Sequence, residues 1–300
     1  MTHSSKIMAG PQQRTVPKVP FVQLNTLWIQ VGGTLCNLQC THCFISCGPQ
    51  NHTHGMMKLS QVRHLLKESR LLGTNDYYIT GGEVLMNPEI FEILEAILQH
   101  GPLDVLTNGT LITPEKAAQL REIQDRSAHP LQFRVSMESF EEKTNDKIRG
   151  KGAFNRAVEG IRNLGSAGFL PILTVTRSWD DGQDLEMEAR FLEFLKSLNV
   201  PEPRLKILPG FLIGRLEENF RAYSSDEHVT EKCFENYDIT NLQCATSRMA
   251  TEKGIYVCPI LVNHDDANMG DTLKETLRPF ALAHPACYTC RVTGMTCRSE

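Results

Sequence analysis

Short hydrophobic runs alternate with segments of helical periodicity between about residues 26 and 209. The runs are short enough to be buried parallel strands. The predicted strands are Leu27–Val31, Tyr77–Thr80, Asp104–Thr107, Gln132–Met137, Pro171–Thr176 and Arg204–Leu208. The segments with apolar residues near helical spacing are Leu59–Leu72, Pro88–Gln99, Pro114–Ile123, Ala153–Ala167 and Leu185–Leu198. Repeated strand–helix units predict an α/β fold with a parallel sheet.

The residues at two helix starts agree with this order. Asn87 and Thr113 each place a capping side chain before a proline, and proline suits the first helical position. Six strand–helix units can form a partial (β/α)6 barrel or an open doubly wound sheet, and periodicity does not distinguish the two. The choice depends on the chemical motifs.

Length and charge narrow the classes of protein. The 300 residues are enough for one barrel-sized domain and a smaller appendage. The formal net charge is -4 and there is no long block of Lys and Arg, so nucleic acid and anionic membrane are not expected partners. No stretch reaches the roughly 20 apolar residues that span a bilayer, and residues 1–25, a predicted N-terminal extension, contain no signal-peptide apolar region. We therefore expect a cytoplasmic protein.

Ten cysteines in such a chain call for a metal, because cytosolic thiols are kept reduced and rarely form a disulfide framework. Cys36, Cys40 and Cys43 follow the first predicted strand with C-x3-C-x2-C spacing. Three thiolates can hold a 4Fe-4S cluster and leave one iron open to an external ligand. In a parallel barrel this loop lies at the C-terminal mouth, where sites are built. A zinc site completed by His42 or Cys47 is the alternative.

The segment with this spacing resembles the radical S-adenosylmethionine (SAM) superfamily, in which an aromatic-type residue precedes the third cysteine. His42 occupies that position. One strand–helix unit later, Gly81-Gly82-Glu83 resembles the Gly-Gly-Glu element of the superfamily. The resemblance covers roughly residues 26–215, and it implies a partial (β/α)6 TIM-like barrel that binds a 4Fe-4S cluster and SAM.

The resemblance also implies which side chains contact SAM. Glycines permit close approach to backbone, and a glutamate can accept from the SAM ammonium group. Polar residues at later strand ends would complete the site, although many relatives carry aspartate where Glu138 stands. Asn108 also lies in a plain turn sequence, and Arg215 could merely cap a surface. The implied set is His42, Gly81, Gly82, Glu83, Asn108, Ser136, Glu138 and Arg215.

A second group of cysteines lies near the C-terminus and resembles the SPASM/Twitch extension of radical SAM enzymes, in which a β-hairpin, a helix and a cysteine pair hold an auxiliary Fe-S cluster. The expected ligands are Cys244, Cys258, Cys287 and Cys290, with Cys297 as an alternate. A structural zinc ribbon is the alternative for this group. The predicted domains are the barrel at 26–215, a linker at 216–243 and a small Twitch-like domain at 244–300.

By this resemblance the protein is an oxidoreductase that cleaves SAM to a 5'-deoxyadenosyl radical and abstracts a hydrogen from its substrate. An auxiliary 4Fe-4S cluster could accept the surplus electron, which favours oxidation of a small hydroxylated metabolite. Modification of a peptide, or a zinc or redox module without SAM chemistry, are the alternatives. A flavodoxin- or ferredoxin-type protein would be the electron donor. The polar turn of His264, Asp265 and Asp266 is interpreted as a solvated loop.

Overall fold

The computed structural model describes residues 15–180 and 182–294. The strands of its main sheet are β2 (Thr26–Ile29), β3 (Asp76–Ile79), β4 (Leu103–Thr107), β5 (Leu131–Ser136), β6 (Ile172–Thr176), β7 (Arg204–Leu208), β8 (Ser247–Thr251), β9 (Gly254–Tyr256) and β10 (Asn268–Gly270). The helices are α1 (Leu59–Leu71), α2 (Ile90–Leu98), α3 (Pro114–Asp125), α4 (Glu142–Arg149), α5 (Ala153–Ser166), α6 (Asp184–Ser197), α7 (Arg215–Asn219) and α8 (Pro285–Thr293). Two short strands, β1 (Lys18–Val19) and β11 (Phe280–Ala281), pair with each other.

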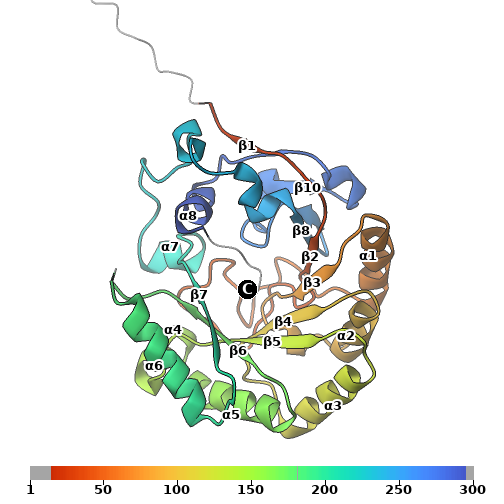
Figure 1. The fold of residues 1–300 in the computed structure, drawn as a ribbon, viewed down its shortest axis with the longest axis vertical. Helices are drawn as coiled ribbons and strands as arrows, with labels where there is room; N and C mark the ends of the chain where they lie inside the picture. Colours follow the sequence, from red (N-terminus) through yellow and green to blue (C-terminus); the bar gives the residue numbers. More distant parts are fainter. Residues whose placement is uncertain (1–14, 181, 295–300) are drawn as a thin grey trace, which may run out of the picture.

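Strands β2 to β7 are parallel neighbours in chain order, and the helices between them lie along the outside of a curved sheet (Figure 1). The full order is β10-β9-β8-β2-β3-β4-β5-β6-β7, so the sheet has two ends and the barrel is not closed. This order confirms the predicted partial barrel and excludes the doubly wound alternative, whose strand order reverses at a switch point.

The two faces of the sheet carry different residues. Apolar side chains such as Ile29, Tyr77 and Val105 belong to the core that packs against the helices. The other face is the barrel interior, where Trp28 stacks on Tyr78 with ring centroids 4.4 Å apart. This alternation is the period-two pattern of a strand, and it directs the interior side chains toward the strand ends where a site is built.

The C-terminal segment joins the barrel sheet. Strand β8 pairs in parallel with β2, in the register Thr26 with Ser247 and Ile29 with Ala250, and β9 returns antiparallel to β8. The expected hairpin is therefore present, but the sequence did not predict that it extends the sheet. Helix α4 and the pairing of β1 with β11 were also not predicted.

One helix start differs from the prediction. Thr113 caps α3 as expected, since its hydroxyl accepts from the Lys116 amide. Asn87 does not cap α2, which begins at Ile90. Its side-chain amide instead donates to the Val31 and Met57 carbonyls, at 2.8 and 2.9 Å. These buried carbonyls need a donor, so Asn87 ties the end of β2 to the loop before α1.

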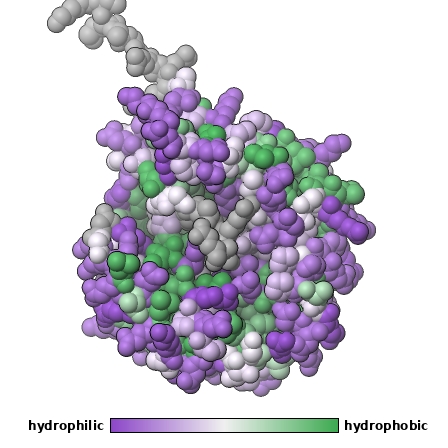
Figure 2. Space-filling model, in the orientation of Figure 1, coloured by the Kyte–Doolittle hydropathy of each residue, from purple (hydrophilic) through white to green (hydrophobic). Residues whose placement is uncertain are grey.

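Figure 2 shows a face that is mostly polar, with hydrophobic patches in its lower middle and toward its upper right edge. Within the described residues, no helix combines the length and the apolar character needed to cross a bilayer.

Candidate functional site

The loop between β2 and α1 carries Cys36, Cys40 and Cys43 and lies beyond the carboxyl ends of the strands. Burial raises the pKa of the Cys36 thiol to about 12, and burial also raises the pKa of Cys40. A hydrogen bond from Cys47 lowers the pKa of Cys43 to about 5. The backbone amide of Cys47 also donates to the Cys43 sulfur at 3.3 Å. Cys47 thus supports Cys43 through hydrogen bonds.

The number of donors bears on the choice between zinc and an iron-sulfur cluster. Three thiols on the first loop fit a 4Fe-4S cluster with one open metal corner. A tetrahedral zinc site would need a fourth donor. His42, one candidate for that donor, instead contacts the Glu138 carboxylate at 2.9 Å.

Gly81 and Gly82 allow the end of β3 to touch this loop. The Gly82 and Glu83 amides donate to the Gly33 and Leu35 carbonyls at 2.9 and 3.0 Å. A Cβ at Gly82 would lie 2.0 Å from the Leu35 oxygen. The resemblance implied that these glycines admit SAM, and the structure adds a second reason for glycine here, the close contact between the end of β3 and this loop.

Glu83 lies fully buried at the centre of a set of donors. Its carboxylate accepts from the Thr107 hydroxyl at 2.7 Å, from the Asn108 amide at 2.8 Å and from the Leu85 amide at 3.1 Å. Burial raises the pKa of Glu83, and these donors oppose the shift. The Asn108 side chain in turn donates to the Cys36 sulfur at 3.7 Å. The strand ends of β3 and β4 are thereby joined to the first cluster cysteine.

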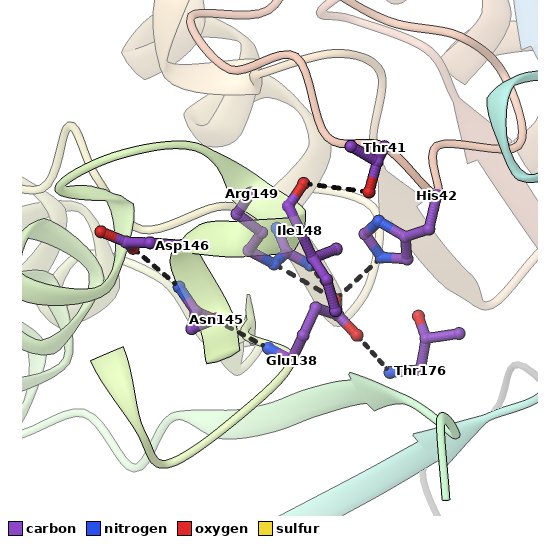
Figure 3. A network of polar contacts seen from close by, with 8 residues as sticks. All are labelled: Thr41, His42, Glu138, Asn145, Asp146, Ile148, Arg149 and Thr176. Atoms are coloured by element: carbon purple, nitrogen blue, oxygen red, sulfur yellow. Dashed lines mark hydrogen bonds and ion pairs between the residues drawn. The ribbon is translucent and has the colours of Figure 1, made fainter. Parts of the chain in front are cut away.

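His42 and Glu138 meet in the network shown in Figure 3, at 2.9 Å between Nε2 and Oε1. Arg149 forms a hydrogen-bonded ion pair with the same carboxylate oxygen, and the Thr176 amide donates to the other oxygen at 3.0 Å. Burial alone would raise the pKa of Glu138, but the charges of Arg149 and His42 lower it to about 2. Glu138 is therefore ionised and holds the residue that precedes Cys43.

Arg149 is a site residue that the sequence analysis missed. It comes from α4. The carbonyl of its neighbour Ile148 accepts from the Thr41 hydroxyl, as Figure 3 shows, and from the Thr41 backbone amide at 2.9 Å. Helix α4 thus holds the loop of the first three cysteines. Burial raises the pKa of Cys40, and the positive charge of Arg149 opposes that shift. A signal for it was absent because the residues that α4 buries, Asn145 and Arg149, are polar.

Arg215 and Gly214 also contact the cluster loop. The Arg215 amide donates to the Cys43 carbonyl at 3.1 Å, and its guanidinium donates to the Cys47 carbonyl. Gly214 has φ +57°, and a Cβ there would lie 2.4 Å from the Phe44 oxygen. The glycine thus lets α7 begin directly against the loop, and Arg215 adds positive charge beside the thiols.

The barrel interior contains buried polar atoms without a hydrogen-bond partner among the described residues. They include both side-chain polar atoms of Gln30, the indole nitrogen of Trp28 and the hydroxyl of Thr174. Ser136, another predicted residue, lies at the end of β5 beside this interior. Buried polar groups normally find partners, so orphaned ones near a mouth indicate contacts with a bound molecule. In the sequence, only the period-two alternation of polar residues along the strands could have pointed to Gln30 and Thr174 as interior residues.

The late cysteines line a cavity of their own. Cys244, Cys258, Cys287 and Cys290 share this cavity with apolar residues, among them Leu261 and Phe280. Burial raises the pKa of Cys244 to about 12, and it raises the pKa of Cys258 and of Cys287. Four sulfurs and no carboxylate in an apolar setting fit the donor set of an Fe-S cluster. Cys297, the alternate ligand, lies outside the described residues.

Comparison with known proteins gives one family. A sequence profile of the radical SAM superfamily matches residues 31–195. The chain is 32% identical over 135 residues to the mycofactocin maturase MftC of Mycobacterium tuberculosis, covering 45% of this chain and 33% of the relative. It is 33% identical over 165 residues to an AdoMet-dependent heme synthase of Methanosarcina barkeri, covering 54% of this chain and 45% of the relative. The matches thus span a third to a half of these relatives.

Solved structures share the fold. The structure of Streptococcus suis SuiB bound to precursor peptide SuiA aligns with a TM-score of 0.63 at 15% identity, over 86% of this chain and 65% of SuiB. The structure of anSMEcpe with bound AdoMet and Cp18Cys peptide aligns with a TM-score of 0.59 at 16% identity, over 84% of this chain and 79% of that protein.

Proposed function

This chain belongs to the radical SAM superfamily, and from that premise we propose that it oxidises its substrate with an auxiliary 4Fe-4S cluster as electron acceptor. Membership establishes a 4Fe-4S cluster and SAM as cofactors. The observation that carries the proposal is the cavity lined by four cysteines, separate from the loop of Cys36, Cys40 and Cys43. An auxiliary cluster there could accept the electron that a substrate radical loses on oxidation.

When bound, the first cluster supplies the electron that cleaves SAM to methionine and a 5'-deoxyadenosyl radical. The residues of the chain do the rest of the work by binding and orientation. Cys36, Cys40 and Cys43 would hold the cluster, while Glu138 and Arg149 fix the loop through His42. Glu83, Asn108, Ser136 and Arg215 would bind polar groups of SAM. The interior hydrophobic residues exclude water and competing hydrogen donors.

For the substrate we propose a small hydroxylated metabolite. The orphaned side chains of Gln30 and Thr174 support a polar molecule inside the barrel, because a bound hydroxyl would give each of them a partner. A peptide is the second candidate, and it is favoured by the similarity to a protein named a maturase. In both cases Cys244, Cys258, Cys287 and Cys290 would hold the auxiliary cluster. A flavodoxin- or ferredoxin-type protein in the cytoplasm would supply the first electron.

Release of 5'-deoxyadenosine tests the first part of this function. The protein is reconstituted anaerobically with iron and sulfide, reduced with dithionite and given SAM. Cys40→Ala removes one of three cluster ligands, so we expect the release rate to fall to background. Cys233→Ser is the matched control, because Cys233 belongs to neither cysteine set, and its rate should equal that of the parent. Release at the parent rate by Cys40→Ala would refute the assignment.

Iron content tests the second part. Two 4Fe-4S clusters give about eight iron ions per chain, and a protein that cannot hold the auxiliary cluster should contain about four. We expect the double variant Cys258→Ser, Cys287→Ser to show this fall and to retain cleavage of SAM. An iron content of the double variant equal to that of the parent, or only about four iron ions in the parent, would contradict an auxiliary Fe-S cluster.

A further inference from the structure

A group of nitrogen and oxygen donors lies next to the late cysteines and outside the cluster sites. His264 and Asp266 come from the segment that follows β9, and His284 directly precedes α8. One donor atom from each of the three residues lies within 4.8 Å of the others, and Nε2 of His284 is 2.9 Å from Oδ2 of Asp266. Within residues 15–180 and 182–294, this is the only place where three such donors converge.

From this convergence we propose that His264, Asp266 and His284 bind a borderline divalent metal ion such as Zn²⁺, at a site distinct from both clusters. Two imidazoles and one carboxylate are a donor set that zinc and ferrous iron accept, with a coordination position left for water. Metal–ligand bonds of about 2.0–2.1 Å place tetrahedral donors about 3.3 Å apart. The spacing of these three side chains needs only a small closure to reach that geometry.

His284 and Asp266 form an ion-pair contact that lacks the geometry of a hydrogen bond. Nε2 of His284 is buried and has no hydrogen-bond partner among the described residues, although the carboxylate oxygen is 2.9 Å away. The nitrogen therefore lies near the carboxylate without pointing at it, as two ligands of one ion do. The His264 and His284 rings meet edge to face with centroids 4.8 Å apart, so both rings border the same space.

The position of the residues gives the ion a structural role. His284 stands at the start of the helix that carries Cys287 and Cys290, while His264 follows Cys258 by six residues. An ion shared by these residues would fasten the loop after β9 to α8, between the segments that bear three of the four late cysteines. Asp266 has 70% of its side chain exposed, so the ion would reach the site from solvent.

Zinc binding to the cluster-loaded protein tests the proposal. After anaerobic reconstitution, the protein is equilibrated with Zn²⁺, passed through a desalting column and analysed for zinc and iron. We expect about one zinc per chain in addition to the cluster iron, and near zero in His264→Ala and in His284→Ala. Asp265→Asn is the control, because Asp265 is an exposed carboxylate of the same turn outside the donor group, and it should retain the zinc.

X-ray absorption at the zinc edge shows which atoms bind the ion. We expect nitrogen and oxygen ligands at about 2.0–2.1 Å, whereas zinc in a cysteine site would show sulfur at about 2.3 Å. Sulfur ligands, no bound zinc in the parent, or undiminished zinc in both histidine variants would each overturn the proposal. His284 does not cap α8 with its side chain. If His284→Ala nevertheless fails to fold, His264→Ala decides the question, since it leaves α8 unchanged.

Discussion

At the scale of single residues, Glu138 is a buried carboxylate whose charge stabilises the site. Its side chain is 1% exposed, and its pKa is lowered from 4.5 to about 2 by Arg149 and His42 despite burial. A lowered folded-state pKa stabilises the fold at pH values above the unfolded-state pKa, and this contribution is lost as the pH falls toward 2. We expect Glu138→Gln to reduce the free energy of unfolding at neutral pH by about 3 kcal/mol.

The pH dependence separates this electrostatic effect from a simple loss of packing. The difference between parent and Glu138→Gln should be constant from about pH 7 to about pH 5 and narrow toward about pH 3. Urea unfolding of the cluster-free protein, followed by circular dichroism, measures it. Glu141→Gln is the control, because that carboxylate is exposed and three residues away. A difference that does not change with pH would show that the charge of Glu138 is not what stabilises the fold.

At the scale of elements, α4 acts on the cluster loop through Arg149. Removing one partner of a buried ion pair leaves the other charged and unpaired, which typically costs about 3–5 kcal/mol. We therefore expect Arg149→Met alone to be strongly destabilising, and Glu138→Gln with Arg149→Met to be less destabilising than the sum of the two. Free energies of unfolding for the four proteins of this double-mutant cycle give the coupling. A coupling near zero would mean that the pair is not formed.

Arg248 is a buried cation of the C-terminal segment, as Arg149 is of the barrel. It is fully buried, and its guanidinium donates to four carbonyls, those of Cys244, Ser247, Thr276 and Arg278. Lysine keeps the charge but lacks the planar set of donors, so Arg248→Lys leaves buried carbonyls without partners. We expect Tm to fall by several degrees, whereas Lys274→Met, an exposed cation of the same segment, should leave Tm nearly unchanged. Equal Tm values would show that the carbonyls find other donors.

The elements that the sequence predicts are those whose buried face is apolar. Strand β3 and helix α5 follow the period-two and helical patterns, and their bounds differ from the predictions by only a residue or so. Helix α4 escapes this approach because its buried residues are polar, and periodicity of apolar residues cannot detect it. Glu138 could be found because it follows a predicted strand. Its partner Arg149 was missed because it lies on this undetected helix.

Contacts between distant segments limit prediction of the site. The cysteine spacing and the Gly-Gly-Glu element are local patterns, and they bring Cys36, Glu83 and Asn108 together as the strand order requires. His264 looks like part of a solvated turn because His284, which completes the donor group, lies twenty residues later and after two further strands, β10 and β11. Only the three-dimensional structure places two such segments side by side.

At the scale of the whole molecule, the parallel pairing of β8 with β2 makes the C-terminal segment part of the barrel. Every residue of β8 is buried, and the backbone N–H of Gln30 donates to the Ala250 carbonyl at 2.8 Å. Deleting residues 244–300 would remove this strand and expose the β2 edge together with Trp28. We expect the shortened chain to lack a cooperative unfolding transition and to bind little iron, since the loop that follows β2 carries the first cluster.

The full-length double variant Cys258→Ser, Cys287→Ser separates loss of the strand from loss of the late cysteines. It keeps β8 and removes two sulfur ligands, so it should unfold cooperatively and retain about four iron ions. Thermal unfolding and iron analysis of both proteins decide between the alternatives. A segment whose strand completes a sheet cannot be removed without exposing the strand that it covered, so we expect the shortened chain to behave differently from this variant. If the two proteins matched in both measurements, residues 244–300 would instead be an independent domain.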